Sequence, residues 1–139
     1  MRKLFILSVV GLWLALALTA CGGDAAEAPA VGASVGDAVA GETLYKQPVI
    51  GTASAPGCAT CHSLEPNVVV VGPSHAGVAT RAGNYLAGVS AENYLRESIL
   101  NPNAHVVEGF QPGIMYQTYG QELSETEINN LVAFLLTLK

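Results

Sequence analysis

Cys58-Ala59-Thr60-Cys61-His62 is the stretch of this 139-residue chain that constrains the fold most strongly. Two cysteines three positions apart, with a histidine directly after them, are typical of a c-type haem attachment site. The thiols lie one helical turn apart, so both can form thioethers to the vinyl groups of one porphyrin, and the histidine then lies under the iron. The motif predicts one covalently bound haem c, attached through Cys58 and Cys61, with His62 as the first axial iron ligand.

Two other kinds of site contain closely spaced cysteines. A thioredoxin-like redox pair needs a βαβ pattern around the motif, whereas a loop rich in Gly, Ala and Pro precedes Cys58. A structural zinc site needs four ligands. Only His75 and His105 are left to complete one, at spacings that match no common zinc pattern. Haem attachment is therefore the preferred interpretation.

Residues 1–20 are predicted to be an export signal. A positive start at Arg2 and Lys3 precedes an apolar stretch over residues 4–18. The segment ends in Leu-Thr-Ala-Cys, which resembles the bacterial lipobox, in which the cysteine is diacylated and becomes the new N-terminus. Cys21 is then a lipid anchor. An uncleaved transmembrane helix is the alternative, although the run is at the short end of what spans a bilayer.

The rest of the chain is predicted to contain a linker and one small domain. Residues 21–36 have no periodicity and few large apolar side chains, as in a flexible linker. Residues 37–139 form the domain. With two cysteines bonded to haem and Cys21 to lipid, no disulfide is expected. The domain is predicted to be exported and anchored at the outer face of the cytoplasmic membrane, or facing the periplasm.

The mature chain is acidic. Without the signal it contains four Lys and Arg against eleven Asp and Glu, a formal charge of −7. This charge makes nucleic acid an implausible partner. A partner with a basic docking patch would attract the domain, and salt would weaken the attraction.

Three helices are expected within the domain. Asp37 can cap a first helix that runs to about Lys46. A second helix is expected over residues 91–100, because a serine that can cap it precedes this range and an Asn-Pro pair that would end it follows. Ser124 and Glu127 form a capping box before a C-terminal helix. Its apolar residues recur at helical spacing: Ile128, Leu131, Val132, Leu135 and Leu138.

Loops are expected between these helices. Residues 63–89 and 101–122 are rich in Gly, Pro and Asn. Within the first of these ranges, the four valines at 68–71 are expected to form an extended buried segment. The second range contains Met115, which stands in a Gly/Pro loop and not on an apolar helix face, where a core methionine normally lies. Met115 is thus a candidate for the second axial ligand, beside two histidines.

The order of these motifs resembles that of class I mono-haem cytochromes c over about residues 37–139. The attachment site is followed by Gly72-Pro73, by YLRESILNPN, by a Gly-x-Met loop and by the closing LVAFLLTLK. The resemblance implies an all-α cytochrome c fold, with three to four short helices around one covalently bound haem and crossing N- and C-terminal helices. Gly41 and Tyr45 would meet Phe134 at this crossing, where glycine lets the backbones approach closely.

The resemblance also implies roles for individual residues. His62 is the proximal ligand, and the Pro73 carbonyl accepts its other ring N–H. Met115 is the distal ligand, and thioether ligation raises the reduction potential. Arg81 falls where the family places a donor near a haem propionate, with a solvated surface arginine as the alternative.

Two positions depart from the family pattern. Tyr116 follows the methionine where proline is usual, and His75 stands where an apolar haem-packing residue is common. Ligation by His75 or His105, and an open sixth position, are therefore kept as alternatives.

The function implied is that of a membrane-tethered mono-haem c-type cytochrome that transfers single electrons by Fe(III)/Fe(II) cycling between redox proteins, and not that of an enzyme. One alternative is a fixed mono-haem subunit of a respiratory or photosynthetic complex, since the resemblance extends to lipoprotein subunits such as those of alternative complex III. Another is a haem enzyme or gas sensor with an open sixth site.

Overall fold

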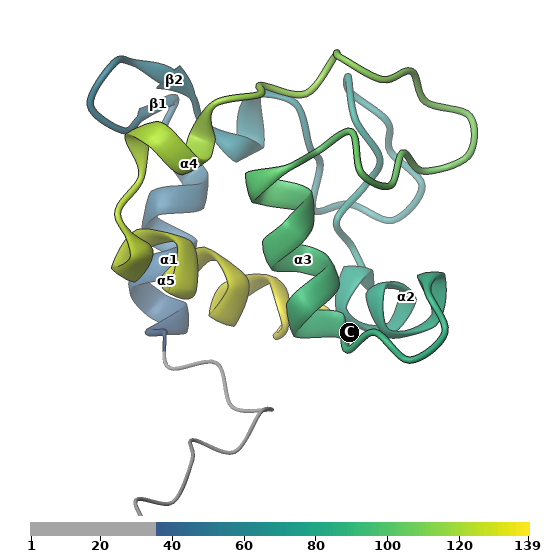
Figure 1. Cartoon of the computed structure of the whole chain (residues 1–139). Helices are drawn as coiled ribbons and strands as arrows, with labels where there is room; N and C mark the ends of the chain where they lie inside the picture. Colours follow the sequence, from purple (N-terminus) through teal and green to yellow (C-terminus); the bar gives the residue numbers. More distant parts are fainter. Residues whose placement is uncertain (1–35) are drawn as a thin grey trace, which may run out of the picture.

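The computed structural model describes residues 36–139, which are mostly helical (Figure 1). The elements follow one another as α1 (Ala38–Lys46), β1 (Val49–Ile50), β2 (Ala55–Pro56), the 3-10 helix η1 (Cys58–Thr60), α2 (Val78–Tyr85), α3 (Ala91–Leu100), α4 (Tyr119–Glu122) and α5 (Glu125–Leu135). The all-α prediction is confirmed. The predicted signal peptide, Cys21 and the linker up to residue 35 lie outside the described residues.

The three expected helices begin at the predicted caps. The Asp37 carboxylate accepts hydrogen bonds from the backbone N–H groups of Val39 and Ala40, at 2.8 and 3.2 Å. Ser90 caps α3 in the same way, and a complete capping box at Ser124 starts α5. These contacts satisfy N–H groups that have no partner inside the helix.

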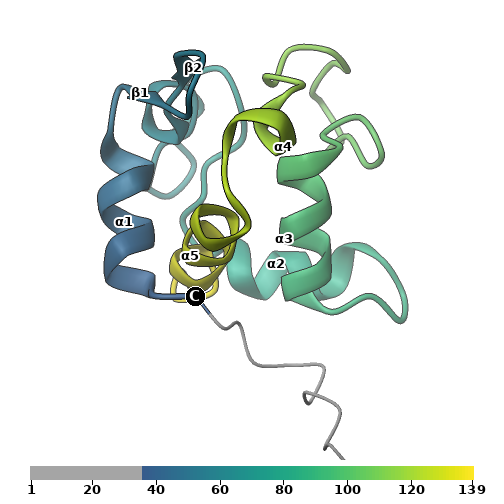
Figure 2. The ribbon, with the colours of Figure 1, turned by 60° about the vertical axis from the view of Figure 1, so that its left-hand side comes forward.

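The core forms where α1 crosses α5. In Figure 2, α5 is seen nearly end-on while α1 runs vertically beside it. Gly41 permits this crossing, since a Cβ there would lie 1.9 Å from the Asn130 carbonyl oxygen of α5. One turn later the rings of Tyr45 and Phe134 pack with centroids 5.2 Å apart. The crossing expected from the resemblance is thus present.

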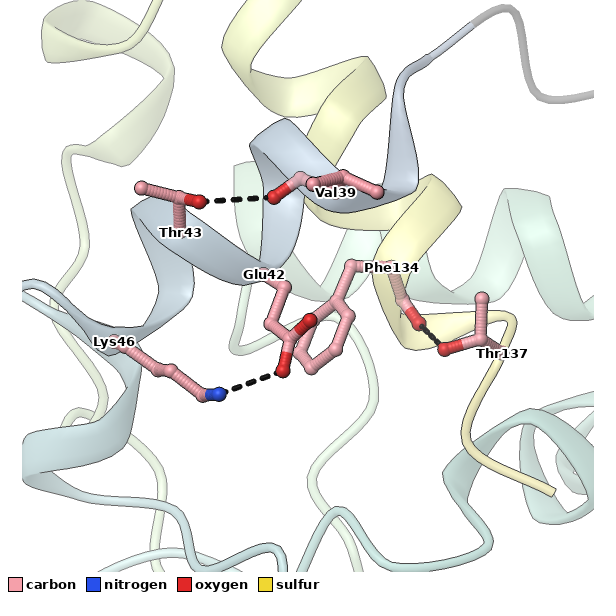
Figure 3. A network of polar contacts seen from close by, with 6 residues as sticks. All are labelled: Val39, Glu42, Thr43, Lys46, Phe134 and Thr137. Atoms are coloured by element: carbon pink, nitrogen blue, oxygen red, sulfur yellow. Dashed lines mark hydrogen bonds and ion pairs between the residues drawn. The ribbon is translucent and has the colours of Figure 1, made fainter.

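The polar contacts drawn in Figure 3 join residues three or four positions apart, while the Asp37 N–H donates across the junction to the Asn130 side chain of α5 at 2.7 Å. Glu42 and Lys46 form an exposed ion pair at 2.6 Å, four residues apart, and the Thr43 hydroxyl donates to the Val39 carbonyl. Exposed ion pairs of this kind contribute little to stability. The apolar and backbone packing beneath them is therefore what holds the two helices together.

Several elements lie where loops were expected. Within residues 63–89, α2 follows Gly77, which has a positive φ of 68° and provides no side-chain cap. Its buried residues are Val78, Ala79 and Ala82, none of which is a large apolar side chain. α4 lies within residues 101–122, and the two-residue strands β1 and β2 pair as a hairpin. Elements this short have too few positions for a periodic pattern.

The predicted burial of residues 68–71 is wrong. The four valines are between 46 and 60% exposed. They have no sheet to cover them, since only Val69 forms an isolated bridge, with His62. None of the helices formed by residues 36–139 is long and apolar enough to span a bilayer.

Replacing Gly41 with valine is expected to lower the free energy of unfolding by about 3 kcal/mol, because the new side chain would overlap the α5 backbone. Chemical denaturation measures the effect. Gly83→Ala is the control: its Cβ would meet only the Ala91 Cβ at 3.8 Å, and alanine favours helix. Equal losses in the two variants would contradict the close approach at Gly41.

Candidate haem-binding site

A cavity of about 660 Å³ lies between α3, α5 and the loops that precede α2 and follow α3. This volume is typical of cofactor sites. Cys58, Cys61 and His62 line it together with Met115, and most of the other lining side chains are apolar. The structure therefore brings the predicted attachment residues and the candidate distal ligand to one apolar space, and the residues present fit a haem.

The backbone that follows the motif folds around His62. The N–H groups of Val71 and Gly72 both donate to the Cys61 carbonyl, at 3.1 and 3.0 Å. Gly72 lies so close to His62 that a Cβ would be 2.4 Å from its ring. The His62 Nδ1 is 2.8 Å from the Pro73 carbonyl oxygen. This is the contact expected from the resemblance, and it leaves Nε2 as the nitrogen that can ligate iron.

His62 is held in neutral form. Burial lowers its pKa, and the hydrogen bond to the Pro73 carbonyl opposes this in part. A metal ligand must be deprotonated. Burial thus favours the imidazole form that ligation requires.

His75 packs against His62 on the same side of the cavity. The two rings stack with centroids 4.0 Å apart and planes 14° from parallel. The Tyr45 hydroxyl lies 3.1 Å from the His75 Nδ1 and donates to the His62 carbonyl at 3.2 Å. Because a hydroxyl has one proton, the arrangement that satisfies both contacts has His75 donating from Nδ1 to Tyr45.

Burial is the main cause that lowers the pKa of His75 to about 3, with smaller contributions from His62 and Arg81. His75 is therefore neutral at physiological pH. It does not suit the sixth position, because two imidazoles that share an iron must point their nitrogens toward each other, whereas these rings lie face to face. His105 is exposed, with its Nε2 3.5 Å from a Glu97 oxygen.

The cysteines do not resemble a redox pair. Both are free and half-buried, and burial is the main cause that raises the pKa of the Cys58 thiol to about 12. Thioredoxin-like cysteines instead have lowered pKa values. Within residues 36–139 no three His, Cys, Asp or Glu side chains form an arrangement that could hold a metal ion.

The loop that carries Met115 is closed by side-chain hydrogen bonds. Asn103, just after α3, accepts from the Gly113 N–H at 2.8 Å and donates to Gln117 at 2.6 Å. Gln117 in turn donates to the Met115 carbonyl. Met115 itself is half-buried against the core. The loop is therefore fixed on both sides of the methionine.

Tyr116 and Glu122 add a contact that the sequence did not indicate. The Tyr116 hydroxyl donates to the Glu122 carboxylate, which is 9% exposed. The other carboxylate oxygen accepts from the N–H groups of Ala53 and Ala55, both at 3.2 Å. A lone Glu in a loop-like stretch carries no signal of burial, so sequence reasoning had no means of finding it.

Arg81 is half-buried and lines the cavity. Its guanidinium donates to the backbone carbonyls of Ser74 and Ala76, at 2.6 and 2.5 Å. The alternative of a solvated surface arginine does not hold. Contact with a haem propionate stays a prediction, for which the guanidinium has further donors.

Replacing Tyr45 with phenylalanine is expected to lower the free energy of unfolding by about 2 kcal/mol, because buried partners on His75 and His62 lose their hydrogen bonds. Denaturant titration provides the measurement. Tyr85→Phe is the matched control, since no hydroxyl contact is made by Tyr85 within the described residues. A Tyr45→Phe variant as stable as this control would show that the hydroxyl contributes nothing.

A protein-family model described as Cytochrome c matches residues 38–139. No curated protein matches the chain.

Proposed function

The chain belongs to the cytochrome c family, and from this premise we propose that it is a membrane-tethered electron carrier in which His62 and Met115 are the two axial ligands of one haem. The family binds haem c covalently, so the predictions of a cytochrome c fold and of one haem c cofactor are confirmed. Electron transfer is the activity typical of the family. The ligand pair, the tether and the partners are the proposal.

His62, Met115, His75 and His105 all line the cavity, so the observation that carries the ligand assignment is how each of these side chains is held there. The Pro73 carbonyl orients His62 through Nδ1. Of the other candidates, His75 is stacked on His62 and His105 is exposed beside Glu97. Met115 is left as the ligand that the geometry favours.

When bound, the haem supplies a one-electron Fe(III)/Fe(II) couple. The residues of the chain decide what this couple does. His62 and Met115 would occupy both axial positions, so no position is left for a substrate or a gas. Apolar lining residues such as Leu95, Ile99 and Leu131 exclude water, which tunes the reduction potential. Electron transfer, and neither catalysis nor gas sensing, is the function that this arrangement supports.

Met115→Ala is expected to abolish the weak far-red charge-transfer band of the oxidised protein, to lower the reduction potential and to allow carbon monoxide to bind the reduced form. Visible spectroscopy and potentiometric titration measure these changes. His105→Ala is the control and should leave all three properties unchanged. Carbon monoxide binding by the unaltered protein would favour the gas-sensor alternative, and an unchanged band in Met115→Ala would remove the ligand assignment.

The membrane tether rests on Cys21 and the lipobox-like residues before it. Labelled fatty acid should be incorporated into the unaltered protein and not into Cys21→Ala, because the lipid chain that provides the attachment is bonded to this cysteine. The absorption spectrum of the variant should stay the same, since haem uses other cysteines. A membrane-bound unaltered protein that incorporates no fatty acid would indicate an uncleaved transmembrane segment instead.

A stand-alone carrier and a fixed subunit of a larger complex make the same use of the haem site, because fold does not determine partners. We propose the carrier, with a basic docking patch on its partner as the complement to the negative net charge. Native electrophoresis after mild detergent extraction separates the two possibilities. Migration with large membrane subunits would favour the complex.

A further inference from the structure

Tyr116, the residue after Met115, is one of the two positions where this chain departs from the family pattern. Proline is usual at this position, and its fixed φ restrains the loop that presents the methionine. Tyr116 lacks this restraint. The chain therefore needs another means of holding the loop against the cavity.

The Glu122 carboxylate provides a fixed point near this loop. It is 9% exposed and belongs to α4, which follows the loop directly. One oxygen accepts a hydrogen bond from the Tyr116 hydroxyl, and the other accepts hydrogen bonds from the N–H groups of Ala53 and Ala55. A Cβ at Gly51 would lie 2.8 Å from the Glu122 Cβ. The hairpin thus encloses the carboxylate and holds it in place.

The same hairpin leads directly into the haem attachment motif. β2 ends at Pro56, two residues before Cys58. A second tyrosine, Tyr119, donates a hydrogen bond from its hydroxyl to the Pro56 carbonyl at 2.6 Å. The rings of Tyr116 and Tyr119 pack edge to face with centroids 5.0 Å apart. Two tyrosines therefore connect the methionine loop to the segment that carries the proximal side of the site.

We propose that Tyr116 and Glu122 are positioning residues that hold Met115 on the iron in place of the usual proline, an inference that rests on the proposed His62 and Met115 ligation. The phenol fixes the backbone next to Met115 to a carboxylate, and the carboxylate is fixed to the hairpin before Cys58. This connection therefore helps to set the distance between the two sides of the haem site, together with the hydrogen bond from Tyr119 to Pro56. Breaking this connection increases the fraction of time that Met115 is away from the iron.

Imidazole binding to the oxidised protein measures this fraction, because imidazole can bind only when Met115 has left, and its apparent affinity scales with the population of that state. Tyr116→Phe and Glu122→Gln are each expected to raise the imidazole affinity about tenfold, the effect of losing one hydrogen bond to a carboxylate. Glu65→Gln, at an exposed carboxylate that does not line the cavity, is the matched control and should behave as the unaltered protein.

The double variant tests whether the two residues act as one connection. If they do, Tyr116→Phe combined with Glu122→Gln raises the affinity no further than the larger single effect. Additive effects would overturn the proposal, as would a Tyr116→Phe variant with unchanged affinity. Tyr116→Phe removes one oxygen and keeps the ring, so it remains informative if Glu122→Gln fails to fold.

A merely structural role predicts a different outcome. It would lower the free energy of unfolding, measured by denaturant, and leave imidazole affinity unchanged under conditions where the protein is folded. Failure of the proposed function is seen separately: the unaltered protein would then lack the far-red band, and the positioning role would fall with it. A normal band together with unchanged affinity in Tyr116→Phe would overturn the positioning role alone.

Discussion

The Tyr45 hydroxyl donates a hydrogen bond to the His62 carbonyl, and this bond connects the helix crossing to the haem-binding segment. The Tyr45 side chain is fully buried, with its ring against Phe134 of α5 and its oxygen against His75. The ring contributes to the core, while the oxygen satisfies two polar groups that would otherwise be costly to bury. The position of His62 therefore depends on how closely α1 approaches α5, and that approach depends on a glycine.

The parts of the fold that could be predicted from sequence are those with dense local signals. The helix caps at Asp37, Ser90 and Ser124 lie where they were expected, because a capping side chain bonds to backbone groups two or three residues away. α2 was missed because Gly77 provides no cap and because none of the buried residues of α2 is a large apolar side chain. The valines at 68–71 were predicted to be buried from their composition, whereas burial depends on a neighbouring element, and here none covers them.

Some residues of the candidate site could be predicted from the sequence, and others could not. Spacing alone pointed to Cys58, Cys61 and His62, and all three line the cavity. The Pro73 contact of His62 was also expected, whereas the Glu122 carboxylate bonds to a hairpin almost seventy positions earlier, a contact that local sequence does not indicate. The stack of His75 on His62 was equally invisible. Both contacts involve a position where the chain departs from its family pattern: His75 in the stack, and Tyr116 through its hydrogen bond to Glu122.

The pairing of the first and last helices also bears on the order of events during folding. The Asp37 N–H bonds to the Asn130 side chain 93 positions later, and Gly41 and Tyr45 lose their main partners if α5 is missing. Contacts of such long range form late in folding. Until α5 has packed against α1, Cys58 and Cys61 lie in an open polypeptide, accessible to the chemistry that joins them to haem.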